Sequence, residues 1–328
     1  MIAAALKSYL RFVLSAAAAT LLMASAAQAQ TYPNRAIRII TPFAAGAVSD
    51  ISLRFVAEKL SAKLGVPVIV DNQQGAGGIS AGRQAAAAPA DGYTLTLLSN
   101  ATAVSAGLFK KLPFDPRTDF VPVLGISDFE YLFVTNSASP YKSLKEFMTA
   151  AAAKPGTLNV GTSAAGTSNH LTALLFKTAA KLDFVVVPYR GASELAVALL
   201  RNDLDMVINA YGGLRQGIEK GDIRVLATST PARVPQFPDV PTVQELGVTG
   251  FDVSSWNGLY APAKTPPEIV AKLTAAMREV MKEPEMAKRF ADLGLTVRPF
   301  EPQELDRRMK VEIERWSKVI EEAGIERQ

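Results

Sequence analysis

Residues 36–70, AIRIITPFAAGAVSDISLRFVAEKLSAKLGVPVIV, decide the fold class of this chain. The first five are mostly β-branched and lead into a loop of small residues. Apolar residues then recur at helical spacing from Leu53 to Leu64, and Gly65 ends this predicted helix. The last five residues form the next apolar run. Strand, small-residue loop, helix and strand in this order predict a βα unit in a mostly parallel sheet.

The same order recurs along the rest of the chain. Further strands are expected at residues 93–98, 129–135, 158–161, 184–187, 204–208, 223–228 and 251–260. Helical segments at residues 266–282, 285–293 and 301–323 follow the last strand. We therefore expect two similar α/β blocks and a helical tail that packs on the first block. The strands at 129–135 and 251–260 are the candidate crossings between the blocks, and two short crossings form a hinge.

The first 29 residues differ from the rest of the chain. Lys7 and Arg11 precede an apolar run at residues 12–23, and Ala27-Gln28-Ala29 is typical of a cleavage site. This pattern predicts a secretory signal with Gln30 as the first mature residue. The alternative is a membrane anchor, for which the run is short. No later segment has the length of apolar sequence that spans a membrane, so we expect an exported, soluble mature chain.

Composition excludes several classes of site. The 328 residues include no cysteine and one histidine, which excludes cysteine nucleophiles, cysteine-ligated zinc, iron–sulfur clusters and disulfides. The formal net charge of +4 is small, and scattered Lys and Arg form no nucleic-acid surface. Walker A, G-x-S-x-G and H-E-x-x-H motifs are missing from the sequence. One enzyme remains open, an exported serine hydrolase using Ser163 and His170. The simpler interpretation is a histidine bonded locally at a helix start.

Four loops of small residues indicate a ligand-binding site. Residues 43–50, 99–102, 163–168 and 189–193 each join a strand to a helix and consist mainly of Gly, Ala, Ser and Thr. Backbone N–H groups at helix starts bind anions, and in open α/β sheets these strand ends face the ligand crevice. Any one such loop can also be a plain turn. Two in each block, facing a shared cleft, predict a clamp for a carboxylate.

The energy of such a clamp requires both blocks. A charge-assisted hydrogen bond contributes about 1.5–3 kcal/mol, and association costs about 4–15 kcal/mol. Micromolar affinity needs a net gain of about 8 kcal/mol. Donors from one block alone fall short of this sum, so both blocks are expected to close on the ligand.

Ordered motifs along the mature chain resemble one known family. They include YPNRAIR at 32–38, PFAAG at 42–46, DN at 71–72, GAGG at 75–78, DGYTL at 91–95, VPYRG at 187–191, PDVPT at 238–242 and WNGL at 256–259. These motifs are similar to those of the Bug/TctC family, periplasmic solute-binding receptors of tripartite tricarboxylate transporters. The resemblance covers essentially the whole mature chain.

The resemblance implies an α/β type II periplasmic-binding-protein fold, with two doubly wound domains around a ligand cleft and two hinge crossings. Residues 30–130 and 255–328 would form a discontinuous first domain and residues 131–254 the second. Combined with the four loops, it gives a set of candidate ligand-binding residues. They are Phe43, Ala44, Ala45, Gly46, Ala47, Asp50, Ser99, Asn100, Ser163, Ala164, Ala165, Gly166, Thr167, Ser168, Tyr189, Gly191, Ala192 and Asp205.

Several of these positions have two interpretations. Asp50 either satisfies backbone N–H groups at a helix start or contacts a ligand amine or an ordered water. Asp205 either lines the cleft or is a solvated turn residue. Trp256 either stacks on an aromatic ligand or packs between the domains, and Arg190 either pairs with a carboxylate or lies on the surface. Ala47 stands where many relatives have a second glycine, and its methyl group disfavours a positive φ.

By this resemblance we expect a non-enzymatic receptor without cofactor or metal. Its ligand would be a small carboxylate, whether a di- or tricarboxylate, an acidic amino acid or an aromatic acid. Its partners would be the ligand and the membrane permease subunits, and the receptor would be a monomer. A receptor that presents the carboxylate to a membrane sensor kinase is the alternative that the sequence does not separate from transport.

Overall fold

The computed structural model describes residues 32–43, 45–75, 78–163, 167–189, 191–322 and 324–327. The expected signal segment, residues 1–29, lies outside these described residues. So do the candidate site residues Ala44, Ala164, Ala165, Gly166 and Arg190.

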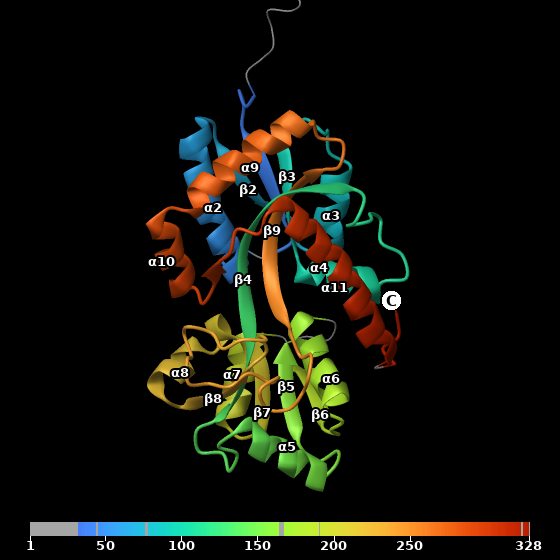
Figure 1. Cartoon of the computed structure of the whole chain (residues 1–328), viewed down its shortest axis with the longest axis vertical. Coiled ribbons are helices and arrows are strands. Elements are labelled where there is room, and N and C mark those ends of the chain that lie inside the picture. Colours follow the sequence, from blue (N-terminus) through green and yellow to red (C-terminus); the bar gives the residue numbers. More distant parts are fainter. Residues whose placement is uncertain are drawn as a thin grey trace, which may run out of the picture.

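Strands and helices alternate along most of the chain, as the sequence predicts (Figure 1). The strands are β1 (Ile37–Thr41), β2 (Val68–Asn72), β3 (Thr94–Ser99), β4 (Phe120–Asn136), β5 (Asn159–Ser163), β6 (Val185–Tyr189), β7 (Met206–Ala210), β8 (Ile223–Thr228), β9 (Ser254–Pro262) and β10 (Thr296–Val297). The helices are α2 (Val48–Leu64), α3 (Ile79–Ala86), α4 (Asn100–Leu108), α5 (Leu144–Ala153), α6 (Ser168–Ala179), α7 (Ala192–Leu200), α8 (Arg215–Lys220), α9 (Pro267–Met281), α10 (Pro284–Asp292) and α11 (Pro302–Glu322). A 3₁₀ turn, Tyr211–Gly213, joins β7 to α8.

The strands form a continuous sheet in the order β2-β1-β3-β9-β4-β7-β5-β6, with β8 and β10 also paired to β4. The pairs β1–β2, β1–β3, β5–β6 and β5–β7 are parallel, which confirms the predicted βα units. The long strand β4 and its neighbour β9 are antiparallel and run from one end of the molecule toward the other. They divide it into two lobes. The first lobe contains β1–β3, β10 and helices α2–α4 and α9–α11, and the second contains β5–β8 and α5–α8.

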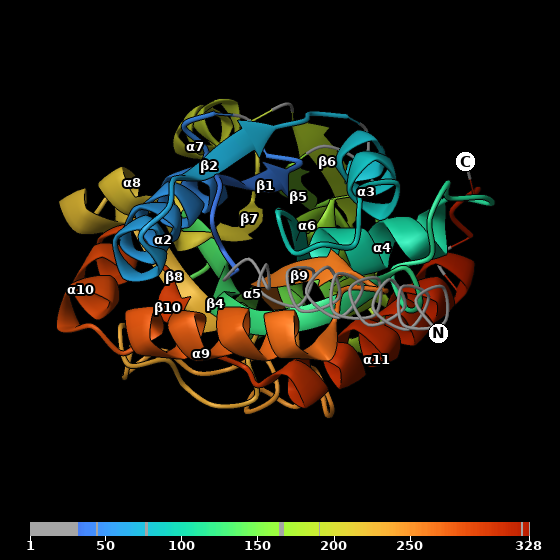
Figure 2. The ribbon, with the colours of Figure 1, turned by 90° about the horizontal axis from the view of Figure 1, so that it is seen from above.

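Helices cover both faces of the first-lobe sheet (Figure 2). One buried cluster joins Ile39 of β1 to Leu53 of α2 and Met277 of α9. Ile40, the next residue of β1, points to the opposite face and belongs to a second cluster with α3, α4 and α11. Successive strand residues thus pack on opposite layers, which explains why these strands are apolar runs rather than alternating patterns.

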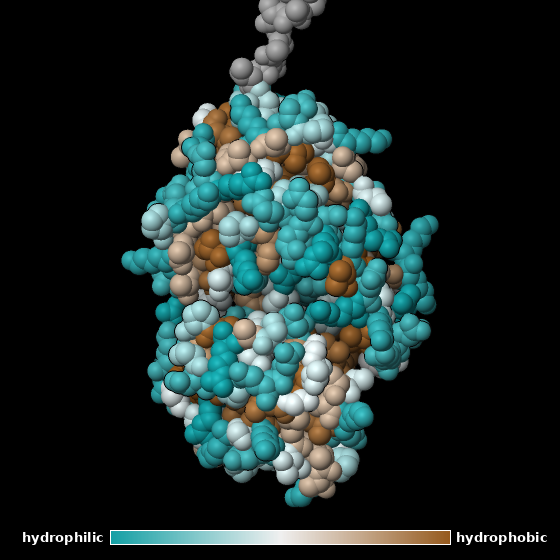
Figure 3. Space-filling view, viewed as in Figure 1, coloured by the Kyte–Doolittle hydropathy of each residue, from teal (hydrophilic) through white to brown (hydrophobic). Residues whose placement is uncertain are grey.

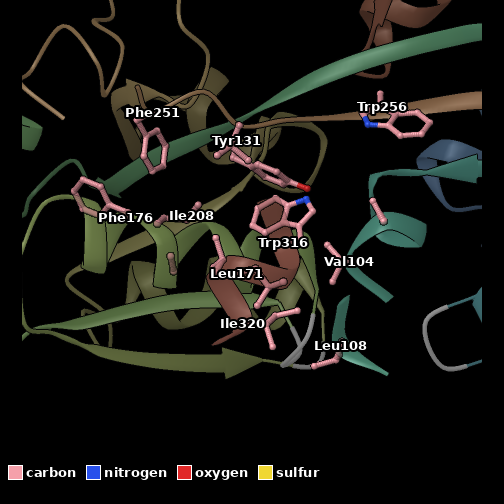
Figure 4. Close-up of a cluster of buried hydrophobic side chains, with 14 of the residues drawn as sticks. Val104, Leu108, Tyr131, Leu171, Phe176, Ile208, Phe251, Trp256, Trp316 and Ile320 are labelled. Atoms are coloured by element: carbon pink, nitrogen blue, oxygen red, sulfur yellow. The ribbon is translucent and has the colours of Figure 1, made fainter. Parts of the chain in front are cut away.

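The second cluster continues from the first lobe into the second. Trp316 and Ile320 of α11 lie beside Leu171 of α6 and Tyr131 of β4 (Figure 4). Trp256 of β9 is also fully buried in this cluster. The structure therefore favours core packing for Trp256 over stacking on a ligand.

Hydrophilic side chains cover most of the face seen in Figure 3. The large exposed apolar side chains of the described residues are Ile51, Ile69, Val185, Val197, Leu200 and Val311. Across the part of the chain that the structure describes, no helix is both long and apolar enough to cross a membrane.

Candidate ligand-binding cleft

A cavity of about 520 Å³ lies between the two lobes. The carboxyl ends of β3, β5 and β7 and the loops after them reach it, as do the β4 and β9 crossings. Its lining residues are Pro42, Phe43, Ser49, Gly75, Gly78, Ser99, Ala101, Thr102, Ser105, Leu108, Phe109, Phe129, Tyr131, Ser163, Thr167, Ser168, Asn169, Asn209, Ala210, Ser255 and Asn257. Three of the four predicted loops contribute described residues to this wall.

A buried carboxylate holds the first of these loops in place. Asp50 is 1% exposed, and its Oδ2 accepts hydrogen bonds from the Gly46 N–H at 2.8 Å and from Arg54 Nε at 3.0 Å. Its Oδ1 accepts from Asn72 Nδ2 at 2.7 Å. The Asn72 amide also donates to the Phe43 carbonyl at 2.9 Å. Asp50 therefore holds the loop through the backbone at Gly46. This agrees with the first interpretation, in which Asp50 satisfies backbone N–H groups at the helix start.

The charge of Asp50 is stabilised by these contacts. Burial raises the pKa of its carboxyl, but the hydrogen bonds from Arg54, Asn72 and Gly46 outweigh burial and hold the pKa below its usual value. The backbone φ angles of Gly46 and Ala47, just before the helix, are both free of strain. Gly46 adopts a φ of +83°, which glycine allows. Ala47 has a φ of −66°, so its methyl group causes no backbone strain.

The second predicted loop begins α4. The Ser99 hydroxyl accepts from the Ala101 N–H at 3.2 Å, and the Thr102 hydroxyl accepts from the Ser99 N–H at 3.2 Å. Asn100 is fully buried and turns away from the cavity, because its Nδ2 donates to Glu312 of α11. Ser99 thus lines the cavity and Asn100 does not. The structure therefore favours a packing role for the Asn100 side chain over a ligand contact.

An amide network forms the second-lobe wall. Asn169 Nδ2 donates to Ser163 Oγ at 2.9 Å and to Asn209 Oδ1 at 3.2 Å. Thr167 Oγ1 donates to Asn169 Oδ1 at 2.7 Å, and the Ala210 N–H donates to Asn209 Oδ1 at 2.9 Å. These contacts fix the orientation of both amides. Asn209 is buried, at 7% exposure, and its Nδ2 has no acceptor among the described residues.

The rest of the wall is apolar or neutral. Leu108 ends α4 and Phe109 follows it, and Phe129 and Tyr131 come from the β4 crossing. Burial raises the pKa of Tyr131 to about 12, so its hydroxyl stays protonated at neutral pH. Asn257 Nδ2 donates to the hydroxyls of Ser127 at 3.2 Å and Ser49 at 3.4 Å. The described lining contains no Asp, Glu, Lys, Arg or His.

The structure places Asp205 away from this cavity. Its Oδ2 accepts from the Asn159 N–H at 2.7 Å, at the start of β5. Ser163 and Asn209, at the other ends of β5 and β7, line the cavity instead. The structure therefore places Asp205 at the opposite end of these strands, where it binds the backbone at the start of β5.

The described residues of the fourth predicted loop lie near the same sheet edge. Tyr189 ends β6, next to Ser163 in register, and Gly191 precedes the first residue of α7, Ala192. Neither Tyr189 nor Gly191 is among the described residues of the cavity lining. The loop residues Ala45 and Gly46 are also exposed beside the cavity rather than within its lining. Their role as ligand contacts stays a prediction.

The serine-hydrolase alternative requires Ser163 and His170 to face each other in the cavity. Ser163 lines the cavity, and its Oγ accepts from Asn169 Nδ2 at 2.9 Å. His170 is outside the cavity lining, and burial lowers the pKa of its ring. The arrangement is suited to holding a ligand by neutral donors and not to general-base chemistry.

Sequence reasoning missed most of the amides and hydroxyls of this wall. Ser49, Asn169, Asn209, Ser255 and Asn257 were not among the predicted site residues. One signal could have identified Asn209, because β7 was expected as a strand of the second block. A polar residue at its carboxyl end must reach the same sheet edge as Ser163.

Comparisons with known proteins agree with this architecture. Residues 52–325 match the tripartite tricarboxylate transporter family receptor, TctC. BugT of Bordetella pertussis is 33% identical over 308 residues, which cover 93% of this chain and 94% of BugT. MatC of Rhodopseudomonas palustris, solved with bound malate, is 32% identical with a TM-score of 0.74, covering 88% of this chain and all of MatC. An R. palustris protein solved with adipate is 31% identical with a TM-score of 0.77, covering 89% of this chain and 98% of that protein.

The similar structures also include the periplasmic binding protein BugD, at 29% identity and a TM-score of 0.76, covering 90% of this chain and all of BugD. Such proteins bind solutes and are not enzymes. Two α/β lobes, a cavity between them and these matches lead to one conclusion: the chain belongs to the TctC family of tripartite tricarboxylate transporter receptors and has the fold of its periplasmic solute-binding proteins.

Proposed function

We propose that this chain is a periplasmic receptor that captures one small carboxylate in the cavity between its lobes. The lobes close on the ligand, and the receptor delivers it to the membrane permease subunits of a tripartite tricarboxylate transporter. Residues 1–29 are removed on export, and the mature receptor is a monomer. The two lobes correspond to residues 30–130 with 255–328 and to residues 131–254.

One observation carries this proposal. The cavity presents neutral hydrogen-bond donors from both lobes, and one buried donor, Asn209 Nδ2, has no acceptor among the described residues. A buried polar group without a partner costs about 1–3 kcal/mol. A carboxylate oxygen is an acceptor that would satisfy it, and a charge-assisted hydrogen bond is stronger than a neutral one.

The shape of the lining supports an acid with an apolar body. Leu108, Phe109 and Phe129 offer carbon surface beside the donors, and the described lining brings no cation to pair with a second or third carboxylate at that wall. The malate and adipate of the two R. palustris structures are small carboxylates of the same general class.

The direct test is calorimetry on the mature protein after unfolding and refolding to remove retained ligand. The panel contains C4–C9 mono- and dicarboxylates, acidic amino acids, citrate and aromatic acids. We expect saturable binding of at least one acid. Heat changes no larger than dilution across the whole panel, together with a native mass spectrum that shows no retained acid, would count decisively against the proposal.

Replacing Asn209 by Asp gives a sharper prediction. The substitution keeps the shape but exchanges the N–H donor for a carboxylate oxygen, which repels a bound carboxylate. We expect the Kd of the best acid in the panel to rise at least tenfold at pH 7, or about 1.4 kcal/mol. The affinity should recover in part at low pH, where the new carboxyl is protonated.

Gln303→Glu is the matched control, because it adds the same charge on exposed α11 outside the cavity. It should leave the Kd within twofold of the starting protein. Equal affinities for the Asn209→Asp variant and this control would show that Asn209 does not face the carboxylate.

A further inference from the structure

The turn that follows the cavity end of β7 touches the first lobe. Asn209 and Ala210 line the cavity, and the 3₁₀ turn begins at the next residue, Tyr211. A Cβ placed on Gly212 would lie 3.2 Å from the Leu293 carbonyl oxygen and 3.4 Å from Val48 Cγ2, both of the first lobe. The chain therefore passes from the ligand cavity to an interlobe contact within three residues.

Hydrogen bonds within the second lobe hold the two side chains that reach the first lobe, Tyr211 and Arg215. Arg215 Nε donates to Glu219 Oε1 at 2.8 Å, and the Tyr211 hydroxyl donates to the same oxygen at 3.1 Å. The Arg215 guanidinium lowers the pKa of the Glu219 carboxyl, so the pair stays charged at neutral pH. The remaining side of the guanidinium is free to reach across the lobes, where Arg215 Nη1 donates to the Asp292 carbonyl oxygen.

The acceptor on the first lobe is the carboxyl end of α10. The last carbonyls of a helix have no intrahelical donors, and the helix dipole makes this end favourable for a cation. Gly294 follows the helix with a φ of +71°. A Cβ at this glycine would lie 2.5 Å from Tyr211 Cδ1, so the Tyr211 ring packs against backbone that has no side chain.

This contact and the apolar contact of α11 lie on different flanks of the hinge strands. In Figure 1, α10 and α8 are at the left of β4, and α11 and α6 are at the right. The right flank is a continuous hydrophobic cluster through Trp316 and Leu171. The left flank combines the hydrogen bond from Arg215 to the Asp292 carbonyl with packing of Tyr211 and Gly212 against the first lobe. Tyr211 belongs to a hydrophobic cluster of the second lobe, whereas Val48 and Leu293 pack on a cluster of the first. No single hydrophobic cluster of the described residues therefore bridges this flank.

We infer that Tyr211 and Arg215 form a latch that seats on the carboxyl end of α10 and holds the two lobes together over the cavity. Neither residue lines the cavity, so both act as positioning residues. A ligand that orders Asn209 and Ala210 would also order the turn that carries the latch. The effect of the latch on the rate of ligand release rests on the proposed function. Its effect on the distance between the lobes does not.

The test measures the interlobe distance in the mature protein. The chain has no cysteine, so Lys111→Cys and Lys154→Cys provide labelling sites for fluorescence energy transfer on exposed residues of the first and second lobe. Arg215→Met removes the charge and keeps the aliphatic stem. We expect it to shift the ligand-free population toward lower transfer or to broaden its distribution. Arg201→Met, an exposed arginine of the same lobe, is the matched control and should cause no shift.

Identical transfer distributions for Arg215→Met and Arg201→Met would overturn the latch. Tyr211→Phe, which removes only the hydroxyl donated to Glu219, should give a smaller shift in the same direction. With adipate as the probe, release from Arg215→Met should be about tenfold faster and association nearly unchanged, because most affinity differences between variants reside in the dissociation rate. Failure of the unaltered protein to bind any acid would remove the proposed function alone, since the distance measurement needs no ligand.

Discussion

Replacing Trp316 by Ala should lower the free energy of unfolding by about 4 kcal/mol. The indole is fully buried and lies where α11 of the first lobe meets α6 and β4 (Figure 4). Truncating a buried tryptophan costs about 3–5 kcal/mol through lost contacts and the cavity left behind. The substitution also removes the donor at 3.4 Å from Glu312 Oε2, a carboxylate that is 5% exposed.

Urea unfolding followed by circular dichroism measures this loss. Trp256 is the other tryptophan of the chain, so its fluorescence reports the unfolding of the variant from a separate position in the same cluster. Trp316→Phe keeps most of the buried ring and serves as the control, with an expected loss of about 1–2 kcal/mol. A loss below 1 kcal/mol for the Ala variant would mean that α11 does not stabilise the junction of the lobes.

The βα units were predictable because each carries its own local signals. The run from Ile37 to Asn72 has a β-branched strand, a loop of small residues, a periodic helix and Gly65, which ends α2 with a φ of +71°. All of these signals act within a few residues of one another. The predicted C-terminal helices agree with α9, α10 and α11 to within one or two residues at each end.

The first half of β4 was not predictable in the same way. Residues 120–128 contain Pro122 and Gly125, which are uncommon inside strands. The structure accommodates both with shifts of register against β9 at Pro122/Leu124 and at Gly125/Ser127. Such bulges depend on the partner strand, more than a hundred residues away in the sequence. A local pattern therefore gave only residues 129–135 of this strand.

Side-chain roles at the cleft depend on the same distant partners. Asn100 follows the N-cap residue of α4, where a polar residue suggests a ligand contact. Its amide instead donates a hydrogen bond to Glu312 of α11. Asp205 accepts from the Asn159 N–H of β5, a partner that lies 46 residues away in the sequence. The spacing of motifs in the sequence located the loops of the cleft. It did not tell which of their side chains would be hydrogen-bonded by residues distant in the sequence instead of facing a ligand.

Asp50→Ala should lower the free energy of unfolding by about 2–3 kcal/mol at pH 7. Breaking a fully buried ion pair costs about 3–5 kcal/mol, and the smaller value follows because the Arg54 side chain is 48% exposed. The substitution leaves the Gly46 N–H and one Asn72 donor without their acceptor. Urea unfolding of both proteins measures the difference, and Arg201→Ala on the exposed surface is the control.

The pH dependence of this difference has a fixed sign. The pKa of Asp50 is lowered in the folded protein, so the folded state stabilises the carboxylate. That stability is fully present above the unfolded pKa of about 3.9 and is lost as the pH falls through the lower folded pKa. The two unfolding curves should therefore converge below about pH 4. If the difference in unfolding free energy between the two proteins stayed constant from pH 7 to pH 3, the ionised Asp50 carboxylate would not be the source of the lost stability.

Asp50→Asn separates a positioning role from a contact with a ligand amine. If Asp50 only holds the loop at Gly46, the Asn variant should weaken the binding of malate and aspartate by the same factor, because the loop loses its position for both acids. If the carboxylate contacts an amine, the aspartate affinity alone should fall. The three donors already occupying Asp50 favour the first result. An aspartate-specific loss would assign Asp50 to the ligand, because Oδ1 accepts from Asn72 alone and keeps one acceptor site for an amine.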